Sequence, residues 1–242
     1  MLSADPGAFF NNFQATSFYT MEKRADAVGE HAGYFLLKTI AAAVSAAVQP
    51  RLARLHLIGH SFGCKVLANA LQTMTEDKRD KNDLAALNQL AVNLILLQAA
   101  FDEDHIEKGD QYGDIAAKFE NIRVLATTSK EDRALSKWYP SAQSAKIVTL
   151  LDEREAMGAV GPTVKAAKPF GGRKDIRVDP NFQRSTVAIL KDRFVVADIT
   201  PLHQDQPTLD AAKAKPDEFS GHHSTIFLPK IYDLMAGFLF GV

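Results

Sequence analysis

Short, almost uninterrupted apolar runs alternate along the chain with amphipathic stretches. The runs at 55–58, 92–97, 122–127 and 194–199 are rich in leucine, isoleucine and valine. Runs of this length with little polar alternation predict strands that are buried on both faces. Strands of this kind that alternate with helices are typical of a parallel sheet with helices on both sides.

Helical periodicity is found before and between these runs. Residues 21–48 place their apolar side chains on one side, and Pro50 ends the pattern; residues 63–75 show the same spacing. A last helix is predicted at about 225–240. The fold class expected from this pattern is α/β, a three-layer sandwich in which helices flank a mostly parallel sheet.

The 242 residues suffice for one α/β domain, and no repeat or low-complexity linker divides them. We therefore expect a single domain over residues 1–242. A long excursion at about 134–193 separates the third and fourth strands, and its middle, 158–181, is rich in glycine, proline, lysine and arginine. This middle part predicts a loop, which is interpreted either as a lid over a site or as a surface insertion.

The pentapeptide Gly-His-Ser-Phe-Gly at 59–63 lies directly between the first strand and its helix. A serine hydroxyl becomes a nucleophile when a base takes its proton and the oxyanion is stabilised. On a tight strand-to-helix turn, Ser61 Oγ would stand above the sheet, with glycines leaving room and the Phe62 N–H facing the oxyanion. A glycine-serine turn in which Ser61 only caps the helix is the simpler alternative. The strand before and the helix after favour the nucleophile.

Residues 57–63, Leu-Ile-Gly-His-Ser-Phe-Gly, resemble the nucleophile elbow of the α/β-hydrolase family of serine esterases and lipases. The resemblance extends over about 21–242, is specific at the elbow, and is looser in the later strands. It implies a catalytic triad in the order serine, acid, histidine. The acid and the histidine would lie on loops after later strands.

Asp132 follows the third predicted strand, which is where the resemblance places the acid. Asp102 and Asp104 follow the second strand and stay as alternatives, since some relatives carry the acid one strand earlier. Asp132 could also be a helix N-cap, a position that suits aspartate. Asp132 is the preferred acid.

The base is expected to be a histidine, because its pKa near neutrality lets it take and return a proton. His222 and His223 lie between the last strand and the last helix, where the resemblance places the catalytic histidine. We prefer His223, next to Ser224, because Ser224 or Thr225 is predicted to cap the following helix and so fix the loop. His222 is the alternate, and His203 also stays open. The remaining histidines are expected to be structural or precede the acid: His31, His56, His60 and His105.

The sequence departs from the family upstream of the elbow. Only 60 residues precede Ser61, with one predicted helix, no strand before Leu55 and no His-Gly oxyanion loop. The resemblance thus implies a hydrolase that lacks its N-terminal strands, and losing one oxyanion donor costs about 2.7–4 kcal/mol in the transition state. One sheet edge would be uncovered, which predicts either a truncated product or a homo-oligomer that covers the edge.

Composition narrows the expected partners and cofactors. A net charge of −1 gives no field toward nucleic acid, so we expect no nucleic-acid partner. Cys64 is the only cysteine, and no third ligand completes a site with His222 and His223, so neither a metal nor another cofactor is predicted. No targeting signal or membrane-length apolar run is seen, and a cytoplasmic location is expected.

The sequence therefore predicts a serine hydrolase that acts on a small-molecule carboxylic ester through an acyl-enzyme on Ser61. His223 would carry the proton, Asp132 would orient the imidazole, and the backbone N–H of Phe62 would bind the oxyanion. The alternative is a non-catalytic or impaired hydrolase scaffold that acts as a binding or assembly module. The two differ in whether the three side chains meet.

Overall fold

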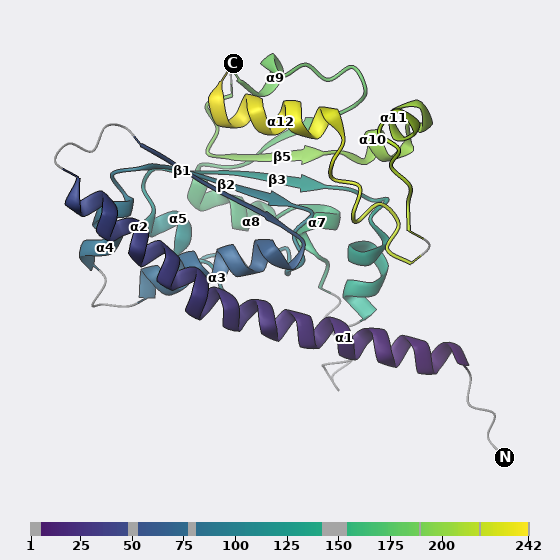
Figure 1. The fold of residues 1–242 in the computed structure, drawn as a ribbon, viewed down its shortest axis with the longest axis horizontal. Helices are drawn as coiled ribbons and strands as arrows, with labels where there is room; N and C mark the ends of the chain where they lie inside the picture. Colours follow the sequence, from purple (N-terminus) through teal and green to yellow (C-terminus); the bar gives the residue numbers. More distant parts are fainter. Residues whose placement is uncertain are drawn as a thin grey trace.

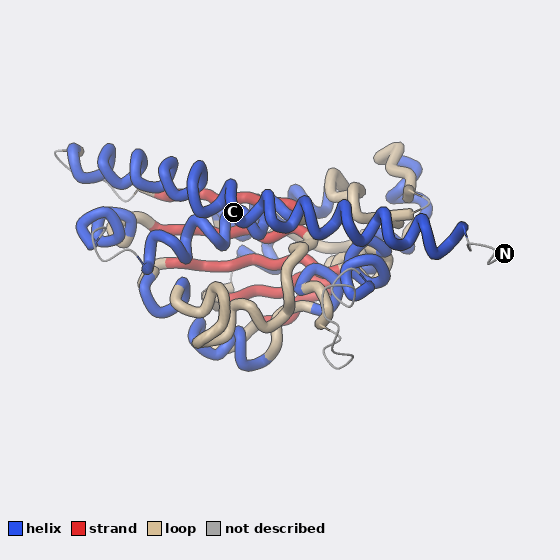
Figure 2. Tube along the Cα trace, turned by 90° about the horizontal axis from the view of Figure 1, so that it is seen from below, coloured by secondary structure: helices blue, strands red, loops and turns tan. Residues whose placement is uncertain are grey.

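The computed structural model describes residues 6–47, 53–76, 81–141, 154–188, 190–217 and 219–241. These ranges form one five-stranded sheet in which all strands are parallel, with helices on both faces (Figures 1 and 2). The strand order is β1-β2-β3-β5-β4. The predicted α/β sandwich is confirmed.

The four strands expected from the apolar runs form, and a short fifth strand joins them at one edge. They are β1 (Arg54–His60), β2 (Ala91–Leu97), β3 (Ile122–Thr128), β4 (Lys174–Arg177) and β5 (Phe194–Asp198). In the centre of the sheet β2 and β3 are buried along almost their whole length. Their side chains alternate between two apolar cores, with Leu94 and Leu96 in one and Ile95 and Leu97 in the other.

Helices supply the other side of each core. Those packed on the first face are α3 (Phe62–Glu76), α4 (Lys81–Leu87), α5 (Ile115–Lys118), α7 (Met157–Val160) and α8 (Val164–Ala167). Those on the second face are α9 (Ser185–Ala188), α10 (Thr200–Gln204), α11 (Gln206–Ala211) and α12 (Pro229–Phe240). The connection after β3 leaves toward the first face, whereas the connections after β4 and β5 leave toward the second.

A long N-terminal helical rod lies outside α3 (Figure 1). It consists of α1 (Pro6–Val28), a π-helical turn (Gly29–Gly33) and α2 (Tyr34–Ala46). The predicted helix at 21–48 is therefore the second part of a longer element. A buried ion pair joins α1 to α3, because the Lys65 ammonium, 2% exposed, lies 2.9 Å from a carboxylate oxygen of Glu22.

The excursion between β3 and β5 is more structured than its composition predicts. The expectation of a loop over 158–181 is wrong for part of its length, since this range contains α8, most of α7 and β4. In β4 the residues are Lys-Asp-Ile-Arg and mostly exposed, so this edge strand carries no apolar run. Residues 142–153 of the excursion lie outside the described ranges.

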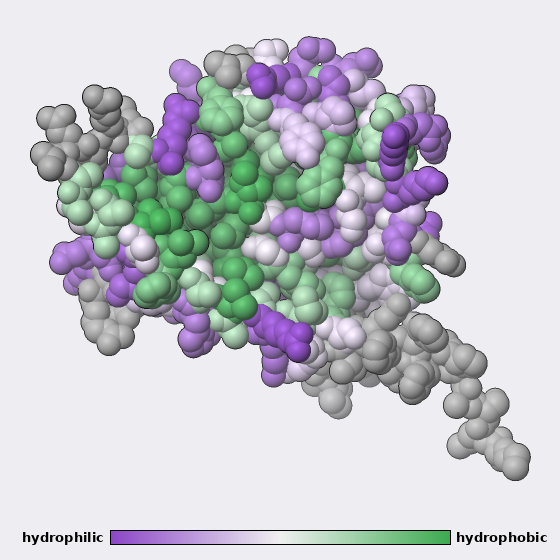
Figure 3. All heavy atoms as spheres, viewed as in Figure 1, coloured by the Kyte–Doolittle hydropathy of each residue, from purple (hydrophilic) through white to green (hydrophobic). Residues whose placement is uncertain are grey.

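At the opposite edge of the sheet, β1 pairs only with β2 among the described strands. Its Ile58 side chain is 50% exposed, and exposed aromatic rings lie on α2 (Phe35) and at the end of α12 (Phe240). Figure 3 shows hydrophobic residues gathered over this part of the molecule. That a second copy covers this edge stays a prediction, which analytical ultracentrifugation tests directly.

None of the helices in the described ranges combines the length and the apolar character that a membrane crossing requires.

Candidate active site

Ser61 lies on the turn between β1 and α3 with a φ of 54°, a conformation that a non-glycine residue adopts only under constraint. Its N–H donates to the carbonyl of Leu97 at 3.0 Å, and its own carbonyl accepts the N–H of Cys64 at 3.0 Å. A Cβ at Gly59 would lie 2.8 Å from Cys64 N, so glycine is required there. At Gly63 a Cβ would meet no described atom within 4 Å, so the expectation that both glycines make room holds only for Gly59.

His223 connects the serine to the acid. Its Nε2 lies 2.7 Å from Ser61 Oγ, and its Nδ1 lies 2.7 Å from Asp132 Oδ2. A carboxylate oxygen only accepts, so Nδ1 carries the proton and Nε2 is left to accept the Ser61 hydroxyl. Because the His223 side chain is 15% exposed and that of Asp132 is fully buried, the pair is partly shielded from solvent.

Asp132 is held by contacts from several segments. Its Oδ1 accepts the N–H of Leu135 at 3.1 Å, and Gln98 Nε2 donates to Oδ2 at 2.8 Å. Gly221, with a φ of 61°, lies against this loop so closely that a Cβ would be 2.5 Å from the carbonyl oxygen of Glu131. This contact places the residues after Gly221 beside the acid.

His60, for which the sequence predicts a structural role, contacts the backbone of His223. Its Nε2 lies 2.8 Å from the carbonyl oxygen of His223, and the two rings are 4.8 Å apart. Burial and the neighbouring His223 ring both lower the pKa of His60, which favours a neutral ring that donates to the carbonyl. The sequence did not predict this contact of His60 or the contact of Gln98 with Asp132. The one feature that could have indicated them is that both residues lie at the end of a strand.

The alternate base His222 points away from Ser61. Its ring stacks on His203 at 4.8 Å, and its Nδ1 lies 3.2 Å from Thr225 Oγ1. His203 also faces Ser129, whose hydroxyl lies 2.8 Å from Nδ1, and is buried behind the loop. Burial lowers the pKa of both histidines, that of His203 to about 4.

The loop before α12 differs from its predicted form. Either Ser224 or Thr225 was expected to cap the last helix. That helix begins at Pro229, after Leu228, with no side-chain cap. Thr225 Oγ1 instead donates to the carbonyl of His222 at 2.8 Å, so it closes the turn that carries the two histidines.

The alternate acid Asp102 belongs to a separate cluster. Its carboxylate accepts from Tyr139 Oη at 2.6 Å and lies 2.9 Å from His105 Nε2 and 3.4 Å from Arg154. Burial alone would raise the pKa of Asp102, but these partners outweigh it and lower the pKa to about 2. Asp104 could join Asp102 and His105 around a cation, yet the Asp102 oxygens are already occupied by protein donors.

The candidate oxyanion donor lies at the start of α3. Among the described residues no hydrogen bond is found for the backbone N–H of Phe62, the first residue of that helix. The Phe62 ring packs edge-on against Phe18 of α1 at 4.9 Å, and Phe18 in turn contacts Tyr139 at 5.7 Å. The rod α1 therefore reaches the neighbourhood of the elbow.

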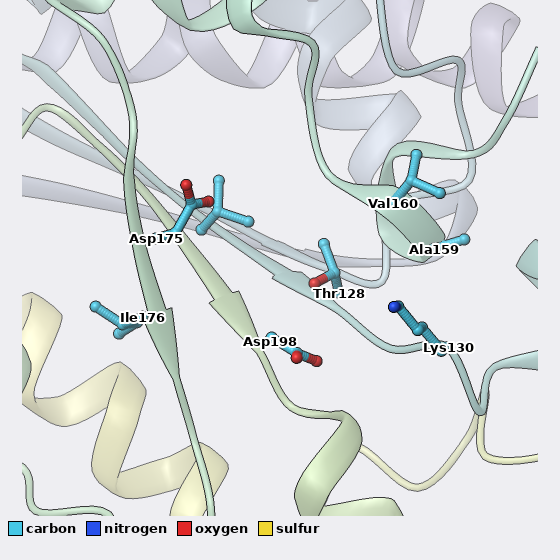
Figure 4. Close-up of a pocket in the computed structure, with 8 residues that line it drawn as sticks. Thr128, Lys130, Ala159, Val160, Asp175, Ile176 and Asp198 are labelled. Carbon is cyan, nitrogen blue, oxygen red and sulfur yellow. The ribbon is translucent and has the colours of Figure 1, made fainter.

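A cavity of about 260 Å³ opens at the carboxyl ends of β3, β4 and β5 (Figure 4). The connections after the neighbouring strands β3 and β5 leave toward opposite faces of the sheet, and the cavity lies at this point. Open α/β sheets commonly bind ligands at such a position. It is lined by Thr128, Lys130, Ala159, Val160, Asp175, Ile176, Val196 and Asp198. Lys130 is on the same loop as Asp132, so the cavity borders the acid side of the site.

Of the residues chosen from the sequence, the structure brings Ser61, Asp132 and His223 together and keeps Asp102 and His222 apart from them. No curated protein and no solved structure matches this chain. Residues 19–149, just over half of the chain, match the model of a family described as alpha/beta hydrolases of unknown function (DUF900), and this match includes both Ser61 and Asp132. The resemblance inferred from the elbow is confirmed, and the chain belongs to this family of alpha/beta hydrolases.

Proposed function

We propose that this protein hydrolyses carboxylic esters through an acyl-enzyme on Ser61. The observation that carries the proposal is the continuous hydrogen-bonded path from Ser61 Oγ through the His223 ring to Asp132, with both contacts at 2.7 Å. A nucleophile, a base and an orienting acid at hydrogen-bond distance are what acyl transfer requires.

The reaction proceeds in two halves. Ser61 Oγ attacks the ester carbonyl carbon while its proton passes to His223 Nε2, and the carbonyl oxygen becomes an oxyanion that the Phe62 N–H binds. The tetrahedral intermediate collapses, the bond to the alcohol breaks, and Nε2–H returns the proton to the departing alkoxide. Water then repeats the sequence on the acyl-enzyme and releases the acid.

The role of Asp132 follows from the tautomer that it selects. By accepting from Nδ1–H, Asp132 keeps Nε2 free to receive the serine proton and stabilises the imidazolium that forms. An asparagine at this position could donate to Nδ1 and select the opposite tautomer. We therefore expect Asp132→Asn to lower kcat by about 10⁴-fold.

The alternative of a non-catalytic scaffold predicts no meeting of the three side chains, and the contacts of Ser61 and His223 support the hydrolase. Carboxylic esters are the proposed substrates because a serine nucleophile attacks them more readily than amides, whose amine is the poorer leaving group. No metal or cofactor enters the proposed steps, since the proton transfers use only protein side chains and water.

A fluorophosphonate probe tests the nucleophile without knowledge of the natural ester. Intact mass should show one probe on the wild type and none on Ser61→Ala. Ser185→Ala is the matched control, because Ser185 is an exposed serine at the start of α9, and it should be labelled like the wild type. A folded wild type that stays unlabelled, or equal labelling of Ser61→Ala, would refute the proposal.

A panel of p-nitrophenyl esters of increasing acyl length then tests turnover. Ser61→Ala should lose about 10⁴-fold or more in kcat, since removing one member of a unit that acts together abolishes its contribution. A variant that retained the wild-type rate would place the hydrolysis elsewhere on the protein.

A further inference from the structure

Gln98 occupies the first position after β2, beside the elbow. Its neighbour Leu97 accepts the N–H of Ser61, so the same turn contacts the backbone of the nucleophile. Gln98 has a φ of 47° and is completely buried. A non-glycine residue in this conformation is strained, and strain of this kind persists where the surroundings determine it.

The side chain of Gln98 is used on one end only. Its Nε2 donates to Asp132 Oδ2 at 2.8 Å and reaches the carbonyl of His222 at 3.5 Å. Its Oε1 is buried and has no hydrogen-bond partner among the described atoms. A buried acceptor without a partner lowers the stability of the folded protein, and so does the strained φ of Gln98. Stability alone therefore does not explain why a glutamine occupies this position.

The orientation of the amide is fixed by its surroundings. An amide oxygen turned toward the Asp132 carboxylate would place two acceptors against each other, so the NH₂ group must face the acid. The Gln98 backbone adds to this constraint, since its N–H donates to Thr127 Oγ1 at 3.0 Å. The backbone and the side chain of Gln98 are therefore each held by a hydrogen bond.

Asp132 Oδ2 therefore receives two donors, His223 Nδ1 at 2.7 Å and Gln98 Nε2 at 2.8 Å. Oδ1 receives the N–H of Leu135. With both oxygens engaged, the carboxylate plane cannot rotate, and Oδ2 stays aimed at the ring.

We propose that Gln98 is a positioning residue, whose amide locks the Asp132 carboxylate in the orientation that holds the His223 ring toward Ser61. Gln98 touches neither the serine nor the substrate in this proposal and acts through Asp132. The inference rests on the proposed function for its kinetic readout, and on the hydrogen-bond geometry alone for its spectroscopic one.

The test uses Gln98→Met in the full chain, because methionine keeps the length of the side chain and removes the donor. We expect kcat on p-nitrophenyl esters to fall about ten- to a hundredfold, as for a lost charge-assisted hydrogen bond, with KM changed by less than about threefold. Gln72→Met is the matched control, because Gln72 is also buried but bonds Glu76 and the N–H of Asp114. The control should keep the wild-type kcat.

Proton NMR gives a readout that is independent of activity. The far-downfield signal of the His223 Nδ1–H, which reports its bond to Asp132, should shift or broaden in Gln98→Met and stay in place in Gln72→Met. In the wild type, the side-chain amide signals of Gln98 should be protected from exchange and should move in Asp132→Asn. This last measurement needs no substitution of Gln98, so a Gln98→Met protein that does not fold still leaves the proposal testable.

The outcomes separate the two proposals. An unchanged His223 signal in folded Gln98→Met, unprotected Gln98 amide protons, or equal losses of kcat in both glutamine variants would overturn the positioning role. A wild type with neither esterase activity nor fluorophosphonate labelling would refute the hydrolase function. In that case the NMR signals alone decide whether Gln98 holds the acid.

Discussion

Replacing His203 by glutamine should change how the stability of this protein depends on pH. His203 lies 3% exposed between Ser129 and Thr225, and its ring stacks on His222. Burial first, and the neighbouring His222 ring second, lower the pKa of His203 from 6.5 to about 4. Glutamine retains a donor and an acceptor for the two hydroxyls and cannot take up a proton.

The sign and the size of the effect follow from linkage between protonation and folding. In the unfolded chain His203 binds a proton near pH 6.5, whereas in the folded protein it does so near pH 4. The stability that the folded protein gains by keeping His203 neutral is therefore fully present above pH 6.5 and is lost as the pH falls toward 4. A difference of about 2.5 pH units at 1.36 kcal/mol per unit gives a loss of about 3 kcal/mol in the free energy of unfolding.

Urea denaturation at several values of pH between 7 and 4, followed by the fluorescence of Trp138, the only tryptophan, measures this loss. Other buried histidines and carboxylates also contribute, so the informative quantity is the difference between wild type and His203→Gln. The free energy of unfolding of the wild type minus that of His203→Gln should fall by about 3 kcal/mol from pH 6.5 to pH 4. The exposed His31→Gln should follow the wild type. Parallel pH dependences of wild type and His203→Gln would refute the reasoning, because His203 would then titrate equally in both states.

Three further substitutions or treatments test separate parts of the structure. Lys65→Met removes a buried ammonium that lies 2.9 Å from Glu22 and 3.3 Å from Asp26, so it should lower the free energy of unfolding by about 3–5 kcal/mol in urea titrations at pH 7. A loss below about 1 kcal/mol would mean that the ammonium is not buried. Gly221→Ala adds a Cβ 2.5 Å from the Glu131 carbonyl oxygen at a residue with a φ of 61°. We therefore expect a destabilisation of about 1–3 kcal/mol by thermal unfolding and slower fluorophosphonate labelling of Ser61. An unchanged labelling rate would mean that the loop at Gly221 does not position the site. Cys64 is fully buried and burial raises the pKa of its thiol, so a disulfide reagent should modify it only in urea, and rapid reaction of the folded protein would contradict this burial.

The sequence was sufficient for the elements that are buried on both faces. All four apolar runs became strands, and β2, β3 and β5 are buried on both faces, because a continuous apolar segment is most stable in the middle of a covered sheet. The prediction of a buried strand is wrong for β1, which lies at the sheet edge with Ile58 50% exposed. Edge strand β4 was missed for the opposite reason. Its residues Lys-Asp-Ile-Arg are mostly exposed, and the strand is held by backbone pairing with β5. Backbone hydrogen bonds do not require particular side chains, so the sequence of β4 carries no apolar pattern that predicts a strand.

The candidate acid Asp132 and the candidate base His223 were chosen from the family resemblance and their order in the chain. Which of the neighbouring residues faces Ser61 depends on geometry that the sequence pattern does not show. His222 and His223 are adjacent and chemically identical, so only the backbone direction after Gly221 decides which ring faces Ser61. That direction is imposed by the close contact of Gly221 with Glu131, between residues 90 apart in the chain. Contacts of this range are set by the whole fold, and the sequence near the histidines does not encode them.

The contacts that hold the proposed triad come from the part of the chain that begins at β1, and not from the N-terminal helices α1 and α2. Ser61, Asp132 and His223 are held by Leu97, Gln98, His60, Leu135 and Gly221, all of which lie on or after β1. None of these contacts involves α1 or α2, so within the described residues Ser61 and His223 are held without a hydrogen bond from either helix. The rod instead approaches the elbow through Phe18, on the side of the Phe62 ring.

Nucleophile activation and oxyanion binding should therefore separate in experiment. The elbow provides the Phe62 N–H, and each further oxyanion donor is worth about 2.7–4 kcal/mol, or about 10²–10³ in kcat. Fluorophosphonate labelling requires Ser61 and His223, and because fluoride leaves phosphorus readily, it depends less on the oxyanion donors than ester turnover does. Turnover of an unactivated ester depends in addition on every donor to the oxyanion. We thus expect labelling that requires Ser61 even where the turnover of simple esters is slow, and the ratio of the two rates measures how complete the oxyanion hole is.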